Sequence, residues 1–188
     1  MPITINGSGT VTGITAGLTS AAMPAGTVIQ TVSDVLDTAS LTVCSNTDTH
    51  TIAGLAATIT LGDSSNKVLV QVALKTAYDG SYNQLVWWLN RNTSSSDNAI
   101  ALGAQEGSNR RRCSGSGGIY NDTQKHVGNE NLVFLDTPGS VGPHTYNIRF
   151  SDAGGNSGEF YVNRPRNDSD TDVYMRTIST ITVQEIAA

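Results

Sequence analysis

Short segments in which apolar and polar residues alternate, separated by clusters of Gly, Ser, Asn and Asp, fill the chain from residue 27 to its end. Residues 144–151 show the pattern clearly: every second side chain from His144 to Phe150 is aromatic or aliphatic or His, and Thr, Asn, Arg and Ser lie between them. This alternation is typical of a strand with one buried and one wet face. No segment repeats apolar residues at helical spacing, although residues 34–39 have room for one helical turn. The pattern therefore predicts an all-β chain.

The expected strands are short and numerous. They cover residues 27–32, 40–44, 49–53, 56–61, 67–75, 84–91, 98–102, 131–135, 144–151, 158–163 and 176–186. Thr, Ser, Gly and Asn make up 76 of the 188 residues and displace the Ala, Glu, Lys and Leu that a helical bundle needs. Short strands joined by such turns are typical of an antiparallel two-sheet sandwich, and we expect a jelly-roll-like one.

Two of the expected strands, in residues 84–91 and 132–135, are apolar on both faces. The first contains both Trp residues of the chain at adjacent positions, so their rings point in opposite directions. One face can serve the core of the domain. The other needs a second cover, because an exposed apolar patch usually marks an interface. We therefore expect an oligomer. The side chains expected at the oligomer interface or in the core are Val86, Trp87, Trp88, Val133 and Leu135.

Residues 1–33 contain no charged side chain. We expect residues 1–26 to form an extended N-terminal arm and hinge, and residues 27–188 to form the β-sandwich body. The arm has no basic segment of the kind that starts a secretory signal. Because a free tail is normally kept soluble by charge, an uncharged arm indicates packing against another protein. The residues expected to anchor the arm are Ile3, Ile5, Val11 and Ile14.

The charge balance argues against nucleic acid as a partner. Lys and Arg number 11 against 16 Asp and Glu, which gives a net charge of −5. Arg110–Arg112 is the one basic cluster in the sequence. It can bind a phosphate or an acidic partner, but its Ser, Gly and Asn neighbours favour a solvated loop.

No apolar run approaches the 20 or so residues of a membrane span, so membrane insertion is not expected. Cys44 and Cys113 lack metal-site spacing and are expected as free thiols, with one disulfide as the alternative.

Five stretches of the chain resemble a known type of viral domain. They are ITINGSGTVTGI (residues 3–14), MPAGTVIQ (23–30), LAATIT with SSNKVLV (55–60 and 64–70), FLDTP with TY (134–138 and 145–146) and STITVQEI (179–186). In this order they resemble a bacteriophage virion domain of tail fibres and capsid-associated appendages in marine and cyanobacterial phages. The resemblance implies a virion structural role, a compact β body and trimerisation. It implies no catalysis.

Three kinds of catalytic or metal site have partial signals in the sequence, and each has a simpler structural explanation. A Ser-His-Asp hydrolase lacks its GxSxG turn. A glycosidase pair would draw on Asp136, Asp152, Glu159 and Glu185, which read more simply as turn and strand residues. The acidic segment 167–172 has the rhythm of a calcium loop without its Gly and closing Glu, and a loose divalent-ion site there stays open. We therefore expect no enzymatic activity, no cofactor and no defined metal site.

The leading hypothesis is a trimeric, non-enzymatic phage virion protein, assembled in the host cytoplasm. Its N-terminal arm would hold it to a capsid or tail protein, and it would act as a decoration, cement or fibre protein. The alternative is a lectin-like tail-fibre tip that recognises host surface polysaccharide. Residues 103–130, the longest irregular segment, favour that alternative because long loops in compact domains are often functional. The candidates for glycan contact are Tyr78, Tyr82 and Tyr120.

Overall fold

A computed structural model describes most of the chain. The described residues are 4–5, 11–12, 23–44, 48–79, 85–93, 97–107, 109–117, 119–120, 125–152 and 158–188. Within these residues all regular structure is β-strand, and no helix is long and apolar enough to cross a membrane. Near the N-terminus, β1 (Thr4–Ile5) pairs antiparallel with β2 (Val11–Thr12).

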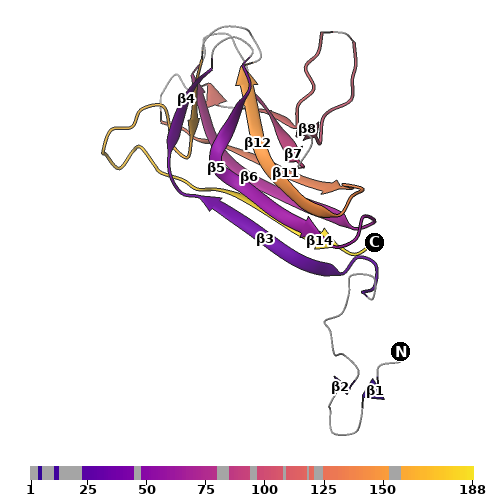
Figure 1. Cartoon of the computed structure of the whole chain (residues 1–188). Coiled ribbons are helices and arrows are strands. Elements are labelled where there is room, and N and C mark those ends of the chain that lie inside the picture. The colour runs from indigo at the N-terminus through magenta and orange to yellow at the C-terminus, as the bar shows by residue number, and fades with distance from the viewer. Residues whose placement is uncertain are drawn as a thin grey trace.

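Two antiparallel sheets make up the body, as Figure 1 shows. The strands of the first sheet are β3 (Val28–Leu36), β14 (Ser179–Ile186), β6 (Lys67–Asp79), β13 (Gly158–Val162), β4 (Ser40–Cys44), β11 (Gly128–Asp136) and β10 (Ile119–Tyr120). The long strand β6 lies at its centre, with β14 and β13 along one edge and β11 and β10 along the other. Only the short β10, among the described pairs of this sheet, runs parallel to its neighbour.

The second sheet has five strands. They are β5 (His50–Leu61), β12 (Gly142–Asp152), β7 (Leu85–Asn92), β8 (Asp97–Ile100) and β9 (Gly115–Gly117). β12 lies between β5 and β7, and both β8 and β9 pair with the far edge of β7. The C-terminus returns to the start of the body, where the Ala187 amide donates to the Thr27 carbonyl at 2.9 Å.

The core lies between the sheets and is built by alternation. In β12 the inward residues Tyr146, Ile148 and Phe150 are at most 1% exposed. Phe150 meets Phe160 of the opposite sheet with ring centroids 4.0 Å apart. Burying aliphatic and aromatic side chains of this size stabilises the fold by about 1.5–3 kcal/mol each. The predicted all-β, two-sheet sandwich is confirmed.

Polar side chains connect the two sheets at both edges. At one edge the Asp34 carboxylate of β3 accepts a hydrogen bond from the Ala56 amide of β5 at 2.9 Å. At the other edge Asp136, which ends β11, forms an ion pair of 2.6 Å with Arg91 of β7. The Tyr146 hydroxyl of β12 donates to the same carboxylate oxygen at 2.8 Å. Polar residues at strand ends therefore fix how the sheets sit on each other.

Each expected strand overlaps an observed one, but three details differ. Residues 49–53 and 56–61 belong to the single strand β5, which passes through a bulge at Gly54, where φ is +77°. The helical turn allowed for at residues 34–39 is wrong, because β3 continues to Leu36 and turns Asp34 towards β5. Residues 103–130 are not one irregular segment, since they contain β9, β10 and the start of β11.

Candidate functional site

The outer face of the second sheet carries a partly exposed indole. Along β7 the side chains alternate, so Trp87 enters the core with 1% exposure while Trp88 points outward. The two rings therefore point in opposite directions, as the sequence predicts. Arg149 of β12 is the cross-strand partner of Trp88. The Cβ atoms of directly paired residues on one face lie about 5 Å apart, so the two side chains leave the sheet next to each other.

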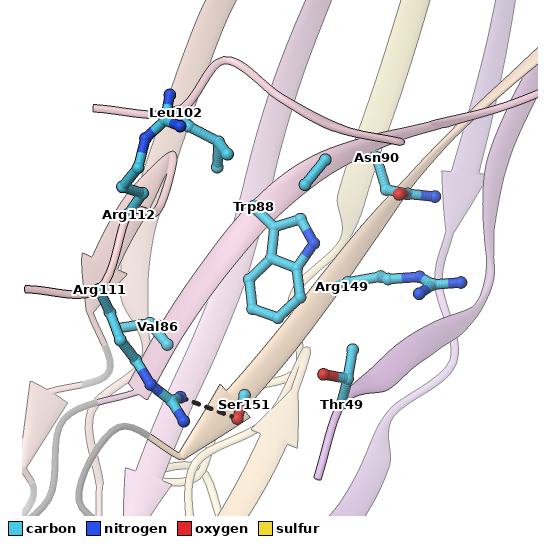
Figure 2. A pocket seen from close by; sticks show the side chains of 10 residues that line it. Thr49, Val86, Trp88, Asn90, Leu102, Arg111, Arg112, Arg149 and Ser151 are labelled. Atoms are coloured by element: carbon cyan, nitrogen blue, oxygen red, sulfur yellow. Dashed lines mark hydrogen bonds between the residues drawn. The ribbon is translucent and has the colours of Figure 1, made fainter. Parts of the chain in front are cut away.

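Trp88 and Arg149 lie in a pocket of about 430 Å³. Its lining residues are Thr49, Val86, Trp88, Asn90, Ala99, Leu102, Arg111, Arg112, Arg149 and Ser151. Figure 2 shows the Trp88 ring in the middle, with Arg149 on one side and Arg111 and Arg112 on the other. The pocket thus combines residues of β7, β8 and β12 with residues of the segment between β8 and β9.

Hydrogen bonds hold that segment, residues 101–114, against the sheet. The Gly103 amide donates to the Cys113 carbonyl at 3.2 Å, so the segment closes on itself. Ser114 fastens its end to β7: its amide donates to the Trp87 carbonyl at 2.9 Å, and its hydroxyl oxygen accepts from the Leu89 amide at 3.0 Å. The position of Arg111 and Arg112 is therefore set by backbone bonds to a sheet strand.

The pocket is cationic although the chain is acidic. Its lining includes three arginines and no carboxylate residue. Arg111 donates to the Ser151 hydroxyl and the Asp152 carbonyl, and Arg112 donates to the Gly103 carbonyl. These acceptors are neutral, so these bonds orient the two guanidinium groups without cancelling their charge. Among the arginines outside the pocket, ion pairs with carboxylates are formed by Arg91, Arg110, Arg164, Arg166 and Arg176.

Three of the residues expected at an oligomer interface or in the core lie on β7. Val86 is 6% exposed within one chain and lines the pocket together with Trp88 and Leu102. Trp87 belongs to the core. Alternation along β7 predicts which face Trp88 occupies. It does not predict that Arg149 and Arg111 meet it there, because strand pairing and the path of residues 101–114 bring them together.

Val133 and Leu135 have a different environment, on the outer face of the first sheet. They are 70% and 49% exposed, and Val35 on the same face is 54% exposed. We call this surface the open face. Its outward residues, in three rows across β11, β6, β14 and β3, are Leu135, Leu69, Gln184 and Thr31; Val133, Gln71, Thr182 and Ser33; and Asn131, Ala73, Thr180 and Val35. None of these side chains carries a charge. A groove of about 240 Å³ runs between β11, β6 and β14.

The three tyrosines predicted to contact a glycan have different positions in the structure. Tyr78 is 2% exposed, and its hydroxyl donates to the Asp152 carboxylate at 2.7 Å. It cannot reach a ligand, so this part of the prediction is wrong. The strand expected at residues 67–75 extends to Asp79 as β6, and the side chain of Tyr78 is therefore buried. Tyr82 lies outside the described residues, and for Tyr120 the structure describes only the backbone, in β10 beside β6.

Of the arm residues, Ile5 and Val11 are paired between β1 and β2. Ile3 and Ile14 lie outside the described residues, and the anchoring role of all four residues stays a prediction.

The carboxylates weighed for catalysis all have bonding partners. Asp136 and Asp152 bond as described above, and Glu159 accepts from the Tyr161 hydroxyl. Glu185 is 1% exposed and accepts from the amide groups of Gln30 at 2.6 Å and Asn66 at 2.7 Å. These contacts are the ones that structural carboxylates make.

The acidic segment near the C-terminus is organised by arginines. Asp168 pairs with Arg164 at 2.8 Å and also with Arg176. In the part of the chain that the structure describes, no group of three or more His, Cys, Asp or Glu side chains could hold a metal ion.

Both cysteines are free thiols, as expected. Cys44 ends β4 and is 0% exposed. Its burial, and then the charges of Asp152 and Asp48, raise the pKa of this thiol from 9.0 to about 11. Because the folded state excludes the thiolate, the contribution of Cys44 to stability is fully present below pH 9 and is lost as the pH rises through about 11.

We expect the two thiols to differ in reactivity. At about pH 8 a thiol-specific reagent should modify Cys113, which is half-buried, and leave Cys44 untouched until the chain is unfolded, because the thiolate is the reactive form. Titration with and without denaturant would measure this. Rapid native modification of a Cys113→Ser variant would contradict it.

No family model matches the chain, and no curated protein matches its sequence. Among solved structures, it is similar to a chain in the structure of infectious bursal disease virus, Gx strain, with 13% identity and a TM-score of 0.34. That similarity covers 85% of this chain and 37% of the viral one, so the chain spans little more than a third of the length of its neighbour. No functional conclusion follows from a likeness at this level.

Proposed function

We propose that the chain is a non-enzymatic structural protein of a bacteriophage virion, that three copies associate through the open face, and that residues 1–26 anchor it to a capsid or tail protein. The open face carries the proposal. Isolated exposed apolar residues are normal, but here Val133, Leu135 and Val35 share three rows of outward side chains without a charge, and on β6 these rows lie between Lys67 and Lys75. A surface that copies of one chain share must avoid like charges, and this surface has none to avoid.

The N-terminal arm supports the same assignment. Residues 1–33, which include the whole arm, carry no charged side chain, and the arm contains one of the stretches that resemble phage virion appendages. A short, uncharged, strand-forming segment can add to the edge of a partner sheet, where backbone hydrogen bonds supply affinity. Three arms on one trimer would strengthen attachment, because the second and third bind at high effective concentration.

Deleting residues 1–22 tests the anchor. We expect a folded chain that assembles normally in solution but is missing from purified particles, because the body is intact and the attachment segment is gone. Quantifying the protein in virions produced with the truncated and the full-length chain would measure this.

Full-length chains with Ile5→Lys and Val11→Lys serve as the matched variants, since they keep the length of the arm and charge its β1–β2 pair. They should be depleted from particles as well. Incorporation of the truncated chain at the full-length level would refute the anchor.

A second candidate function is recognition of host surface polysaccharide by a lectin-like fibre tip. The Trp88 pocket favours it, because an aromatic ring beside arginines and neutral hydrogen-bonding groups is the composition of a recognition site and not of a packed core. The two functions are compatible, since the pocket and the open face lie on the outer faces of different sheets.

A further inference from the structure

We propose that the Trp88 pocket binds an acidic saccharide, whose carboxylate or sulfate group is held by the arginines and whose sugar ring stacks on the indole. This inference rests on the second candidate function and names its ligand class.

The indole supplies a preformed platform. Trp88 is partly exposed in the pocket, and its backbone pairs with β12 on one side. On the other side Ser114 bonds to the two flanking residues, Trp87 and Leu89. A Trp side chain has only two rotatable bonds, so it offers a large contact area at a small cost in conformational entropy. The C–H groups on one side of a pyranose ring form an apolar surface, and the exposed face of an indole is a flat apolar partner for it.

The arginines supply the charge specificity. A guanidinium is planar and binds a carboxylate or sulfate through two parallel hydrogen bonds. Arg111 and Arg112 are already oriented by bonds to neutral oxygens, and each has five N–H donors, so donors remain for a ligand. Figure 2 shows them across the indole from Arg149. An anion that enters the pocket beside the indole meets the positive charge of Arg111 and Arg112.

The neutral groups and the size favour a saccharide over other anions. Thr49 lines the pocket and is exposed, so its hydroxyl can bond to a sugar hydroxyl. Asn90 and Ser151 are 1% exposed and use their donors within the chain, so they form a neutral polar wall. The pocket volume of about 430 Å³ suits a small ligand such as one or two sugar rings. A single-stranded nucleic acid needs a positive groove several nucleotides long, and the net charge of −5 opposes a long polyanion.

Isothermal titration of the full-length protein tests the proposal with matched probes. The probes are a tetramer of uronic acids, a neutral glucose tetramer and a single-stranded oligothymidylate. We expect the uronic acid tetramer to bind at least about tenfold more tightly than either of the others, and to weaken with added salt.

Three variants assign the binding to the pocket. Trp88→Ala should abolish it, and Arg112→Gln should weaken it by at least about tenfold, the loss of one charge-assisted hydrogen bond. Arg110→Gln is the matched control and should bind normally, because Arg110 lies beside the pocket residues in sequence but pairs with Glu106. Circular dichroism of each variant would confirm that the fold is kept.

The possible outcomes distinguish a failure of the acidic ligand class from a failure of saccharide recognition itself. Equal binding of the neutral tetramer, lost in Trp88→Ala, would overturn the acidic ligand and leave saccharide recognition standing. No binding of either saccharide would overturn both. Acidic binding that survives Trp88→Ala and Arg112→Gln, or an oligothymidylate that binds as tightly, would overturn the proposed site, because charge alone would then explain the result.

Discussion

Replacing Asp136 by Ala is expected to lower the free energy of unfolding by about 3–5 kcal/mol, the usual cost of breaking a buried ion pair by removing one partner. Asp136 is 6% exposed, and one of its oxygens accepts from both Arg91 and Tyr146. Without it the Arg91 charge is left uncompensated between the sheets. The Tyr146 hydroxyl, in a residue that is 0% exposed, also loses its acceptor.

Urea denaturation at a fixed protein concentration would measure the loss. Asp136→Asn, which keeps the shape and one acceptor oxygen, should lose less than Asp136→Ala. Asp170→Ala removes an exposed aspartate and should change stability by no more than about 0.5 kcal/mol. If Asp136→Ala unfolded at the same urea concentration as Asp170→Ala, the ion pair would not be a link between the sheets.

Introducing lysine at Val133 and Leu135 together is expected to separate the proposed oligomer into single chains. Both side chains point outward, so the variant should keep its fold. At an interface between copies, however, each lysine would have to be buried without a partner, and burying an unpaired charge costs several kcal/mol. Since every copy carries both changes, the penalty is paid at each contact. Light scattering on a sizing column would measure the mass of the variant.

Val141→Lys is the matched control. Val141 is 62% exposed but lies just before β12, outside the open face. Its mass should equal that of the unaltered chain. Dissociation by Val141→Lys, or an intact oligomer carrying lysine at both Val133 and Leu135, would remove the open face as the contact surface.

Local patterns in the sequence predict the strands because alternation is a local property. The positions of Trp87 and Trp88 follow from β7 alone, and those of Tyr146 and Phe150 from β12 alone. Two-sided apolar strands also predict an exposed apolar surface, which Val133 provides.

The remaining features depend on contacts between distant residues. Tyr78 reads as a loop aromatic, but β6 extends past its apolar segment and its hydroxyl meets Asp152, 74 residues away. Leu102, Arg111 and Arg112 line the same pocket as Val86 only because of where their segment lies on the sheet. The approach of Arg149 to Trp88 depends on which strands pair, and the residue pattern of one strand carries no information about its neighbour.

The mass of the unaltered chain in solution tests the central claim most directly. If the open face joins three copies, analytical ultracentrifugation should give a species of three times the 19.7 kDa of the chain, stable on dilution through the micromolar range. A single species at 19.7 kDa across that range would contradict the claim, because the apolar side chains of the open face would then be stable in water without a partner.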